Sequence, residues 1–308
     1  MATTTSITTT YAGESAGKYI SAALLAGNTI ANGGLTIRPN VKFKEVVKRL
    51  ELDGIVKDGT CDFSDTSTLT LTERILQPKE LQVNLELCKK DFRSDWDAIQ
   101  MGYSAFDNLP SSFQEYLIGY VAGKVAQKTE QNIWAGAEAE GSFDGFSTLL
   151  AAEVDKIPVV GTTVTAENVI AELGKVVDAI PSELYGRDDL HIYVSQNVFR
   201  AYKRSLGGFA ANGVGANGFM AQGNNQDVNV LFFDGVKIFM ANGLSANTMV
   251  ATTKDNLWFG TGLMADSQEV RVLDMADLDG SQNVRVILRF TAGVQYGVAS
   301  DIVTYGIA

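Results

Sequence analysis

The sequence predicts an α+β protein with two sheets, one near a single long helix and the other within a smaller module in the middle of the chain. The first observation is an uninterrupted helical pattern over residues 110–137. The second is that strand patterns dominate residues 41–90 and most of the chain after residue 225. The third is a strand between two helical patterns over residues 166–204, which is typical of a small α/β module.

The long helical pattern repeats apolar side chains at steps of three and four, the spacing of one helix face. Ser112 and Glu115, just after Pro110, match a capping box and mark its start. At about 1.5 Å per residue the helix would be roughly 40 Å long, so its apolar face needs a sheet or a neighbouring subunit as cover. Within the chain we expect that cover to be the strand over residues 284–290. The expected apolar face comprises Phe113, Tyr116, Leu117, Tyr120, Val121, Val125 and Ala126. The residues expected mostly on the other faces are Lys124, Gln127, Lys128, Glu130 and Gln131.

Composition is that of a folded soluble protein of one large or two modest domains, with 308 residues, 45% hydrophobic and 20% charged. The formal net charge of −11 argues against a surface that binds nucleic acid by neutralising phosphates. No apolar run is long enough to predict a membrane span, and the Thr-rich start lacks the features of a signal peptide. Two cysteines, Cys61 and Cys88, make no disulfide framework, so we expect idle or buried thiols and a cytoplasmic origin.

Residues 1–40 are rich in Thr, Ser and Gly and have little apolar surface to offset the entropy of ordering. A short helix over residues 16–25 is possible. We expect this segment, where ordered, to lie over a partner. The alternative is a frayed terminus.

Strands are expected over residues 41–52, 62–71 and 80–87, the last with strict alternation of apolar and polar residues. The turn-rich segment through Asp58-Gly59 and Asp65 joins the first two and has few core residues. This pattern predicts a hairpin that projects from the body. Because a two-stranded ribbon is marginal alone, we expect it to lie on another subunit.

The remaining elements follow in order. Residues 138–150 predict a loop ending in an apolar patch. Residues 166–180 predict a helix capped by Thr165, whose apolar face includes Ile170, and Ser195 is expected to cap a helix after the strand at 190–194. Residues 207–225 predict a flexible loop. The later strands are expected at residues 228–233 and 236–240 around Asp234-Gly235, 249–253, 256–259, 269–275 and 283–290 around Asp279-Gly280, and 302–305.

One motif resembles a serine hydrolase. Residues 13–17 match the G-x-S-x-G pattern, but a Thr-rich segment rather than a strand precedes them. The only histidine, His191, lies in a strand. Ser195 is four positions further along, roughly 13 Å away, too far for a catalytic dyad. We keep a hydrolase only as the alternative from a different functional class and expect His191 to be a satisfied strand residue.

Two further motifs resemble ligand sites. Residues 213–218 match G-x-G-x-x-G, but no strand leads into them, and Asp234 falls in a hairpin turn, so we expect a mobile loop. Asp274, Asp277 and Asp279-Gly280 lack the order and closing Glu of a calcium loop and predict a turn. One histidine and two separated cysteines cannot form a zinc site within one chain. We therefore expect no catalytic, cofactor-binding or metal residues and no enzyme.

The order of elements resembles the major capsid proteins of tailed bacteriophages, which have the Hong Kong 97-type fold. The stretches that carry the resemblance are KELQVNLELCKKDF (79–92), the long helix with QNIWAG (131–136), FDGFSTLL (143–150), HIYVSQNVFRAYKR (191–204), and LFFDGVKIFMANGL (231–244) continuing to VRVILRFTAGVQYGVASDIVTYG (284–306). None of these is specific alone, and the order covers nearly the whole chain.

The resemblance implies five regions. They are an N-terminal arm (1–41), an E-loop hairpin (42–78), a peripheral domain (79–154) with its spine helix (110–137), an axial domain (155–260), and a return to the peripheral sheet (261–308). Because the expected arm begins at Met1, the resemblance implies a separate scaffold protein or none. Lys57 in the hairpin has no surrounding pattern that supports an isopeptide cross-link.

The implied function is self-assembly, as pentamers and hexamers, into an icosahedral virion shell around double-stranded DNA, without sequence-specific contact. Assembly would occur in the host bacterial cytoplasm, with portal, scaffold and decoration proteins as possible partners and with neither membrane nor cofactor. An encapsulin-type shell around a cargo protein shares the fold and stays open as the alternative.

Overall fold

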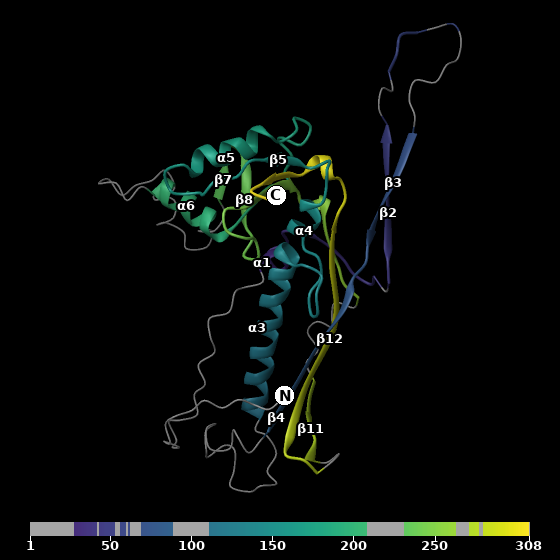
Figure 1. Cartoon of the computed structure of the whole chain (residues 1–308), viewed down its shortest axis with the longest axis vertical. Helices are drawn as coiled ribbons and strands as arrows, with labels where there is room; N and C mark the ends of the chain where they lie inside the picture. The colour runs from purple at the N-terminus through teal and green to yellow at the C-terminus, as the bar shows by residue number, and fades with distance from the viewer. Residues whose placement is uncertain are drawn as a thin grey trace.

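A computed structural model of the chain describes residues 28–41, 43–52, 56–59, 61, 69–88, 111–207, 231–262, 271–276 and 280–307. These residues form an α+β fold with a five-stranded sheet, a six-stranded sheet and a separate two-stranded hairpin (Figure 1). The predicted α+β class and the prediction of one sheet near the long helix and another in the middle of the chain are therefore confirmed.

The five-stranded sheet is built around β12 (Asn283–Tyr296), the longest strand. Its buried residues alternate as predicted, with Val284, Val286 and Leu288 at most 2% exposed. The strand continues to Tyr296, past its predicted end at residue 290. The extension was missed because a glycine, here Gly293, weakens the sequence pattern of a strand. A Cβ at Gly293 would lie 2.8 Å from the Cα of Pro78, so glycine is required for this close approach. The other strands of this sheet are β1 (Thr36–Arg38), β4 (Lys79–Cys88), β10 (Leu257–Gly260) and β11 (Arg271–Asp274).

The long helix α3 (Ser111–Ala135) is unbroken. Val121 packs with Val284 and Val286, which confirms the predicted contact between the helix and this strand. The last turns of the helix instead contact the six-stranded sheet, where the Trp134 and Tyr193 rings lie 5.1 Å apart. The helix therefore links the two sheets, which its amphipathic pattern did not predict.

Two residues of α3 differ from the expected faces. Ala126 is exposed although it was placed on the apolar face. Glu130 was placed on a polar face, but it is 0% exposed. The side chains of residues 111–118 lie outside the description, so the capping box and Phe113, Tyr116 and Leu117 stay predictions.

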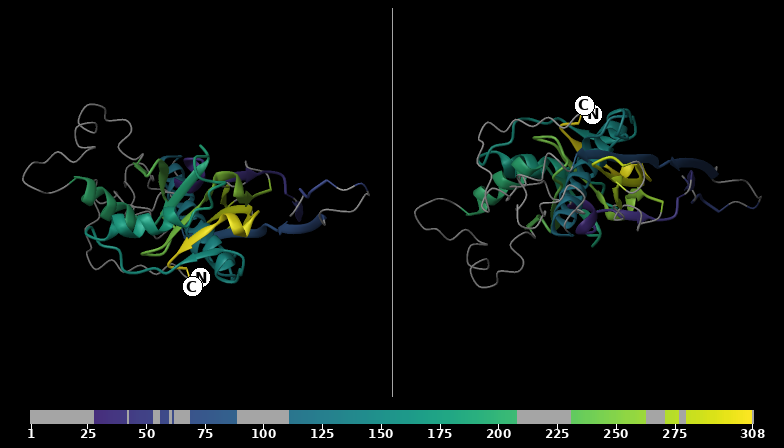
Figure 2. Two further views of the ribbon diagram at one scale, coloured as in Figure 1. Left: turned by 90° about the horizontal axis from the view of Figure 1, so that it is seen from above. Right: turned by 90° about the horizontal axis from the view of Figure 1, so that it is seen from below.

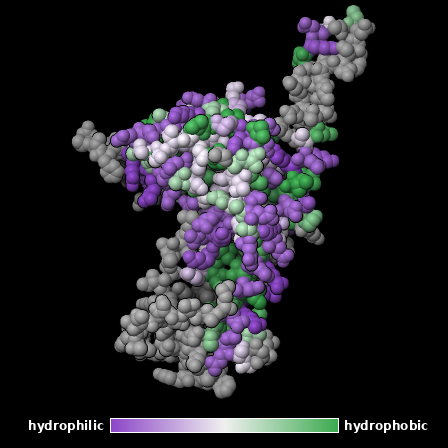
Figure 3. Space-filling view, viewed as in Figure 1, coloured by the Kyte–Doolittle hydropathy of each residue, from purple (hydrophilic) through white to green (hydrophobic). Residues whose placement is uncertain are grey.

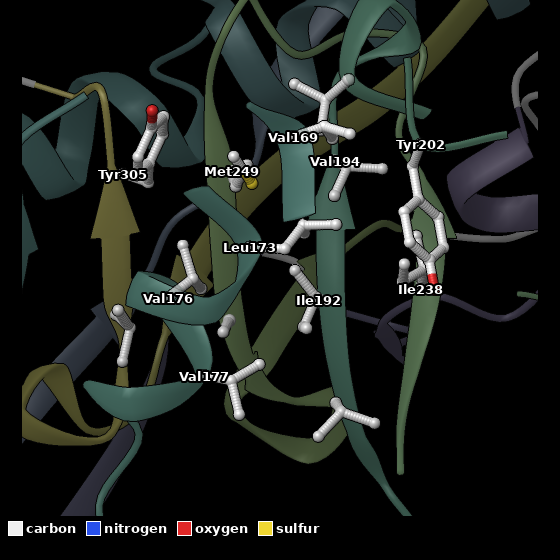
Figure 4. Close-up of a cluster of buried hydrophobic side chains, with 14 of the residues drawn as sticks. Val169, Leu173, Val176, Val177, Ile192, Val194, Tyr202, Ile238, Met249 and Tyr305 are labelled. Atoms are coloured by element: carbon white, nitrogen blue, oxygen red, sulfur yellow. The ribbon is translucent and has the colours of Figure 1, made fainter. Parts of the chain in front are cut away.

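The six-stranded sheet has a hydrophobic core on each of its two faces. On one face lie α5 (Val169–Asp178) and α6 (Gln196–Gly207), whose apolar side chains meet those of the sheet (Figure 4). On the other face, Tyr193 joins a second core with α3 and α4 (Phe146–Ala151). The strand order is β5 (Ile157–Val159), β13 (Val303–Tyr305), β9 (Met249–Thr253), β6 (Leu190–Val194), β8 (Val236–Met240) and β7 (Leu231–Phe233).

Most local predictions in this sheet are confirmed, including the strand over 190–194. Asp234 and Gly235 have φ values of 49° and 80°, as the hairpin turn predicted there requires. Helix α5 begins later than predicted, because the N–H of Thr165 donates to Asn168 Oδ1 at 2.7 Å in a turn before the helix. Ile170 is 51% exposed rather than part of the apolar face. The segment 261–308 is divided, since β12 lies in the five-stranded sheet and β13 in the six-stranded one.

Residues 28–41 pack on their own chain. After the short α1 (Asn28–Ala31), Leu35 is 2% exposed, and β1 pairs in parallel with β10. The expectation that this segment lies on a partner is wrong for these residues, because their apolar side chains fill the chain's own core. Residues 1–27, including the helix expected over 16–25, lie outside the described residues.

Candidate functional site

The most prominent feature is the hairpin of β2 (Glu45–Leu52) and β3 (Leu69–Leu76), which forms a sheet of its own. The strands are antiparallel, with Glu45 opposite Leu76 and Leu52 opposite Leu69. The hairpin leaves the body on the side away from α5 and α6 (Figures 1 and 2). Projection of this hairpin is therefore as expected. The second strand was expected from Asp62, and the structure describes it from Leu69, with residues 62–68 outside the described residues.

The root of the hairpin is held by packing. Leu76, the last residue of β3, is 0% exposed and packs with Val41 and Trp258. A Cβ at Gly260 would lie 2.9 Å from Leu76 Cδ2, so glycine at that position lets β10 approach the root closely. The hairpin therefore starts from a fixed point on the five-stranded sheet.

A polar cluster also holds the root. The Arg74 guanidinium on β3 donates to Glu153 Oε2 at 2.7 Å, and the Tyr296 hydroxyl on β12 donates to the same oxygen. The guanidinium lies over the Tyr296 ring, 4.8 Å from its centroid. Hydrogen bonds from Tyr296 and then Arg74 lower the pKa of Glu153 against the effect of burial. Because three segments meet here, the cluster restricts the direction in which the hairpin leaves the body.

A second polar node lies where the two sheets meet. The Glu130 carboxylate on α3 accepts hydrogen bonds from the Thr29 N–H, at 3.1 Å, and from the Thr29 hydroxyl. The Trp134 indole N–H donates to the Thr29 hydroxyl at 2.8 Å. Glu130, Thr29 and Trp134 are each 0% exposed. We call these three residues the Glu130 node. It joins the segment before β1 to the end of α3.

The third side of the node is the loop after β8. Backbone N–H groups of Asn242 and Gly243 hydrogen-bond the Glu130 carboxylate. A Cβ at Gly243 would lie only 2.0 Å from the backbone oxygen of Glu130, so only glycine fits there. Burial raises the pKa of Glu130, although the hydrogen bonds from Thr29 oppose this rise. The buried Glu130 carboxylate is therefore held by uncharged hydrogen-bond donors.

Burial of Glu130 and Thr29 was missed in the sequence because both residues are polar. A usable signal existed, since Glu130 lies three and four residues before Ile133 and Trp134, which are both buried on the same helix side.

An apolar groove of about 400 Å³ runs between α3 and β4. Leu81, Val83 and Leu85 line it from the strand, and Tyr120 and Val125 line it from the helix. Lys124 and Lys128 also line it, and no carboxylate does among the described residues. Figure 3 shows hydrophobic surface on this face between the upper body and the lower end of the molecule.

The residues that resembled catalytic groups are structural where they are described. His191 is 8% exposed, its Nδ1 lies 2.7 Å from the Asp189 carbonyl oxygen, and burial lowers its pKa. The Ser195 hydroxyl donates to Asn197 Oδ1 at 2.7 Å at the start of α6. The expectation that His191 is a satisfied strand residue is confirmed.

Of the other motif residues, the structure describes only Asp234, Asp274 and Gly280. Residues 13–17, residues 213–218, Asp277 and Asp279 lie outside the described residues. Asp234 lies in its turn, and Asp274 ends β11. Cys61 is exposed and Cys88 is half-buried, both as free thiols, while Lys57 is exposed. Within the described ranges, no group of His, Cys, Asp or Glu could hold a metal ion, and no helix is long and apolar enough to cross a membrane.

Sequence comparisons identify nothing similar, because no family model matches the chain and no curated protein is a detectable relative. Structural comparison does. The chain is similar to the capsid of a native GTA particle computed with C5 symmetry, with a TM-score of 0.62, 15% identity, and 93% of this chain and 92% of that chain covered. It is also similar to the capsid of Myoviridae phage XM1, with a TM-score of 0.57, 11% identity, and 93% and 94% covered. For the capsid of cyanophage P-SCSP1u the TM-score is 0.52 and the identity 13%, with 96% and 91% covered. The chain therefore has the fold of phage capsid subunits along nearly its whole length.

Proposed function

We propose that this chain is the major capsid protein of a tailed bacteriophage, with the Hong Kong 97-type fold. In this proposal it assembles as pentamers and hexamers into an icosahedral shell around the double-stranded DNA genome. The observation that carries the proposal is the fold match to capsid subunits over more than nine-tenths of both chains. Such a shell would form in the host cytoplasm and would become the virion capsid.

The hairpin supplies the mechanism. In this proposal, residues 42–78 are the E-loop, which reaches from one subunit to the next, and α3 is the spine helix of the peripheral domain. Leu76 and the Arg74–Glu153–Tyr296 cluster fix the root, so that each copy presents its hairpin in the same direction. A contact between two different surfaces of identical copies closes into a ring when the rotation between them is constant. Five-fold and six-fold rings of such subunits are the units of the shell.

The domain division accompanies this assignment. We assign residues 1–41 to the arm, 79–154 and 261–308 to the peripheral domain, and 155–260 to the axial domain. β10 and β13, each bonded into the sheet of the other domain, tie the two domains together. A net charge of −11 suits a container, because a strongly basic wall would bind the packed DNA tightly.

The role is structural rather than enzymatic in this proposal, with other copies of the chain as the main partners. Portal, scaffold and decoration proteins complete the assembly. No observation favours an encapsulin-type compartment or a serine hydrolase, so neither is proposed.

The proposal is tested by electron microscopy of the purified protein. We expect closed shells, and an absorbance ratio at 260 and 280 nm that reports DNA in particles from infected cells. Discrete monomers with esterase activity would contradict the proposal.

A deletion tests the mechanism. Replacing residues 53–68 by Asn-Gly keeps the root intact and joins Leu52 to Leu69 by a two-residue turn, because these residues are already paired. We expect folded monomers or capsomers that do not close. Intact shells from this variant would contradict the role given to the hairpin.

A further inference from the structure

We infer that the groove between α3 and β4 binds a free fatty acid, an amphipathic anion with one alkyl chain and one carboxylate. The alkyl chain lies against the apolar walls of the groove, and the carboxylate lies at Lys124 and Lys128. This site goes beyond the proposed function and does not depend on assembly of the chain.

The walls of the groove are apolar on each of the elements that form it. Leu81, Val83 and Leu85 line it from β4, Phe290 from β12 and Val125 from α3. The three β4 residues alternate along the strand, so they share one face. Leu85 is 40% exposed, and Val83 and Val125 are half-buried. A ligand in the groove therefore removes apolar surface from water, which favours binding.

Positive charge lies on the helix side of the groove. Lys124 and Lys128 are both exposed and are four residues apart, so they are neighbours on the helix surface. The Lys124 ammonium lies 5.7 Å from the centre of the Tyr120 ring, which also lines the groove. Within the described part of the chain, neither lysine forms an ion pair with a carboxylate. Like charges at this spacing repel each other, so a bound anion is stabilised by both lysines.

Volume favours one alkyl chain over a helix as the occupant. The groove measures about 400 Å³, which lies within the usual range of small-molecule sites. It follows the helix from Tyr120 to Asn132, about 18 Å along the helix axis. An extended alkyl chain about 15 Å long and about 5 Å across occupies roughly 300 Å³, which fits. An α-helix about 10 Å in diameter occupies roughly 1,400 Å³ over the same length as the groove, which does not fit.

The chemistry of the walls also favours an alkyl chain over an extended polypeptide. Each residue of a polypeptide carries a backbone N–H and C=O, and these groups cost free energy when they are buried without partners. Apart from the two lysines, the described polar side chains that line the groove are Gln82, Thr129 and Asn132. Asn132 already accepts a hydrogen bond from the Ser142 hydroxyl at 3.0 Å. An alkyl chain has no polar groups along its length and needs none of these partners.

The single chain distinguishes a free fatty acid from a membrane phospholipid. Two alkyl chains occupy roughly 600 Å³, which exceeds the volume of the groove. The hydrophobic surface on this face of the molecule, between the upper body and the lower end, is therefore assigned to one chain (Figure 3).

The ligand test uses isothermal titration of the full-length protein with dodecanoate, below the concentration at which dodecanoate forms micelles. We expect one saturable site per chain. Decanoate, which is two CH₂ groups shorter, should bind about tenfold more weakly, because each buried CH₂ contributes to affinity. The methyl ester of dodecanoic acid keeps the chain without the charge and should bind about fivefold more weakly. Equal binding of the acid and the ester contradicts the inference.

The matched variants add the same charge to adjacent residues of β4. Leu85→Glu places a carboxylate in the groove, and we expect at least a tenfold loss of dodecanoate affinity. Asn84→Glu places it on the opposite face of the strand and should leave binding unchanged. Both positions are exposed, and circular dichroism verifies that both variants fold.

A second pair of variants tests the lysines. Lys124→Gln combined with Lys128→Gln should lower dodecanoate affinity about tenfold. Lys203→Gln, an exposed lysine on α6, should have no effect.

The inference is overturned by normal dodecanoate binding in Leu85→Glu, or by an equal loss in Asn84→Glu. Binding to vesicles of anionic phospholipid without binding to dodecanoate also overturns it, because the surface would then recognise a membrane. So does a ligand-free protein that fails to bind dodecanoate and whose oligomeric state changes in Leu85→Glu, because a second copy would then cover the groove.

Discussion

The carboxylate of Glu130 on the long helix accepts hydrogen bonds from both the N–H and the hydroxyl of Thr29, 101 positions earlier in the chain. Both residues are fully buried. The Tyr193 hydroxyl also donates to the Gly34 carbonyl nearby, so the segment leading to β1 is fastened to the helix and to the six-stranded sheet. The Glu130 node is thus a joint between the two sheets.

Replacing Glu130 by Ala should lower the free energy of unfolding by about 2–4 kcal/mol, because several buried donors then lose their acceptor. Chemical denaturation of the unassembled subunit measures this loss. The control is Gln131→Ala, the exposed neighbour on the same helix, which should change stability by less than about 0.5 kcal/mol. Equal effects of the two substitutions would show that the node is not a stabilising joint.

Glu130 also predicts a pH dependence. Burial raises its pKa in the folded protein above the ordinary value of 4.5, so the folded state binds the proton more tightly than the unfolded state. Its favourable contribution is fully present below about pH 4.5 and is lost as the pH rises through the raised pKa. The free energy of unfolding, measured from pH 4 to 7, should lose this contribution in the unsubstituted protein and not in the Glu130→Gln variant. A constant difference between the two proteins would contradict the raised pKa.

Much of the fold followed from periodicity, because apolar spacing reports burial on one face. The strand at 190–194 and the unbroken helix were predictable for that reason, and the Asp234-Gly235 turn was predictable because that dipeptide favours positive φ. The joint between the sheets was not. Glu130 looks like any surface residue of a helix, and its burial depends on Thr29 and Gly243, which are distant in sequence.

At the hairpin, too, one feature was predictable from the sequence and another was not. Projection of the hairpin was predictable from its turn-rich composition. The anchoring of the root by Arg74, Glu153 and Tyr296 was not predictable, since hydrogen bonds across 79 and 143 positions leave no local pattern.

Tyr296→Phe should weaken the root by removing one donor from Glu153. We expect a loss of about 1–2 kcal/mol at neutral pH. The pKa of Glu153 is lowered chiefly by Tyr296, so this contribution is present above about pH 4.5 and disappears as the pH falls through the lowered pKa. The pH dependence of this contribution is therefore opposite in sign to that of the Glu130 contribution. Chemical denaturation of the Tyr296→Phe variant and the unsubstituted protein at pH 7 and pH 3 measures this difference in stability.

The control for the root is an exposed ion pair. Arg285 and Glu86 are each 45% exposed and lie 2.9 Å apart. Glu86→Gln should cost at most about 0.5 kcal/mol, since solvent screens such a pair. A larger effect for Glu86→Gln than for Tyr296→Phe would contradict the importance of the cluster.

A pair of glycine substitutions tests packing at the node. Gly243→Ala places a methyl group 2.0 Å from the Glu130 backbone oxygen, so we expect destabilisation by more than about 2 kcal/mol. Gly174→Ala, in the middle of α5, meets nothing within 4 Å and should stabilise by about 0.5–1 kcal/mol. Thermal unfolding of both variants measures the opposite shifts. A stable Gly243→Ala protein would mean that the loop moves away from α3 easily.

The parallel pairing of β1 with β10 has a consequence for the order of folding during synthesis. Thr36 hydrogen-bonds to the carbonyl of Lys254, 218 positions later in the chain. At about 5–20 residues per second, a ribosome needs roughly 10–45 s to make the intervening chain. For most of that interval, from the synthesis of Leu76 onward, β2 and β3 exist without Trp258, which covers Leu76 at their root. The growing chain therefore exposes the apolar root of its hairpin before Trp258 is made to cover it, and ribosomes on one message hold such chains close together. Expression at lower temperature, or with a chaperone that holds nascent chains, should raise the yield of soluble subunits.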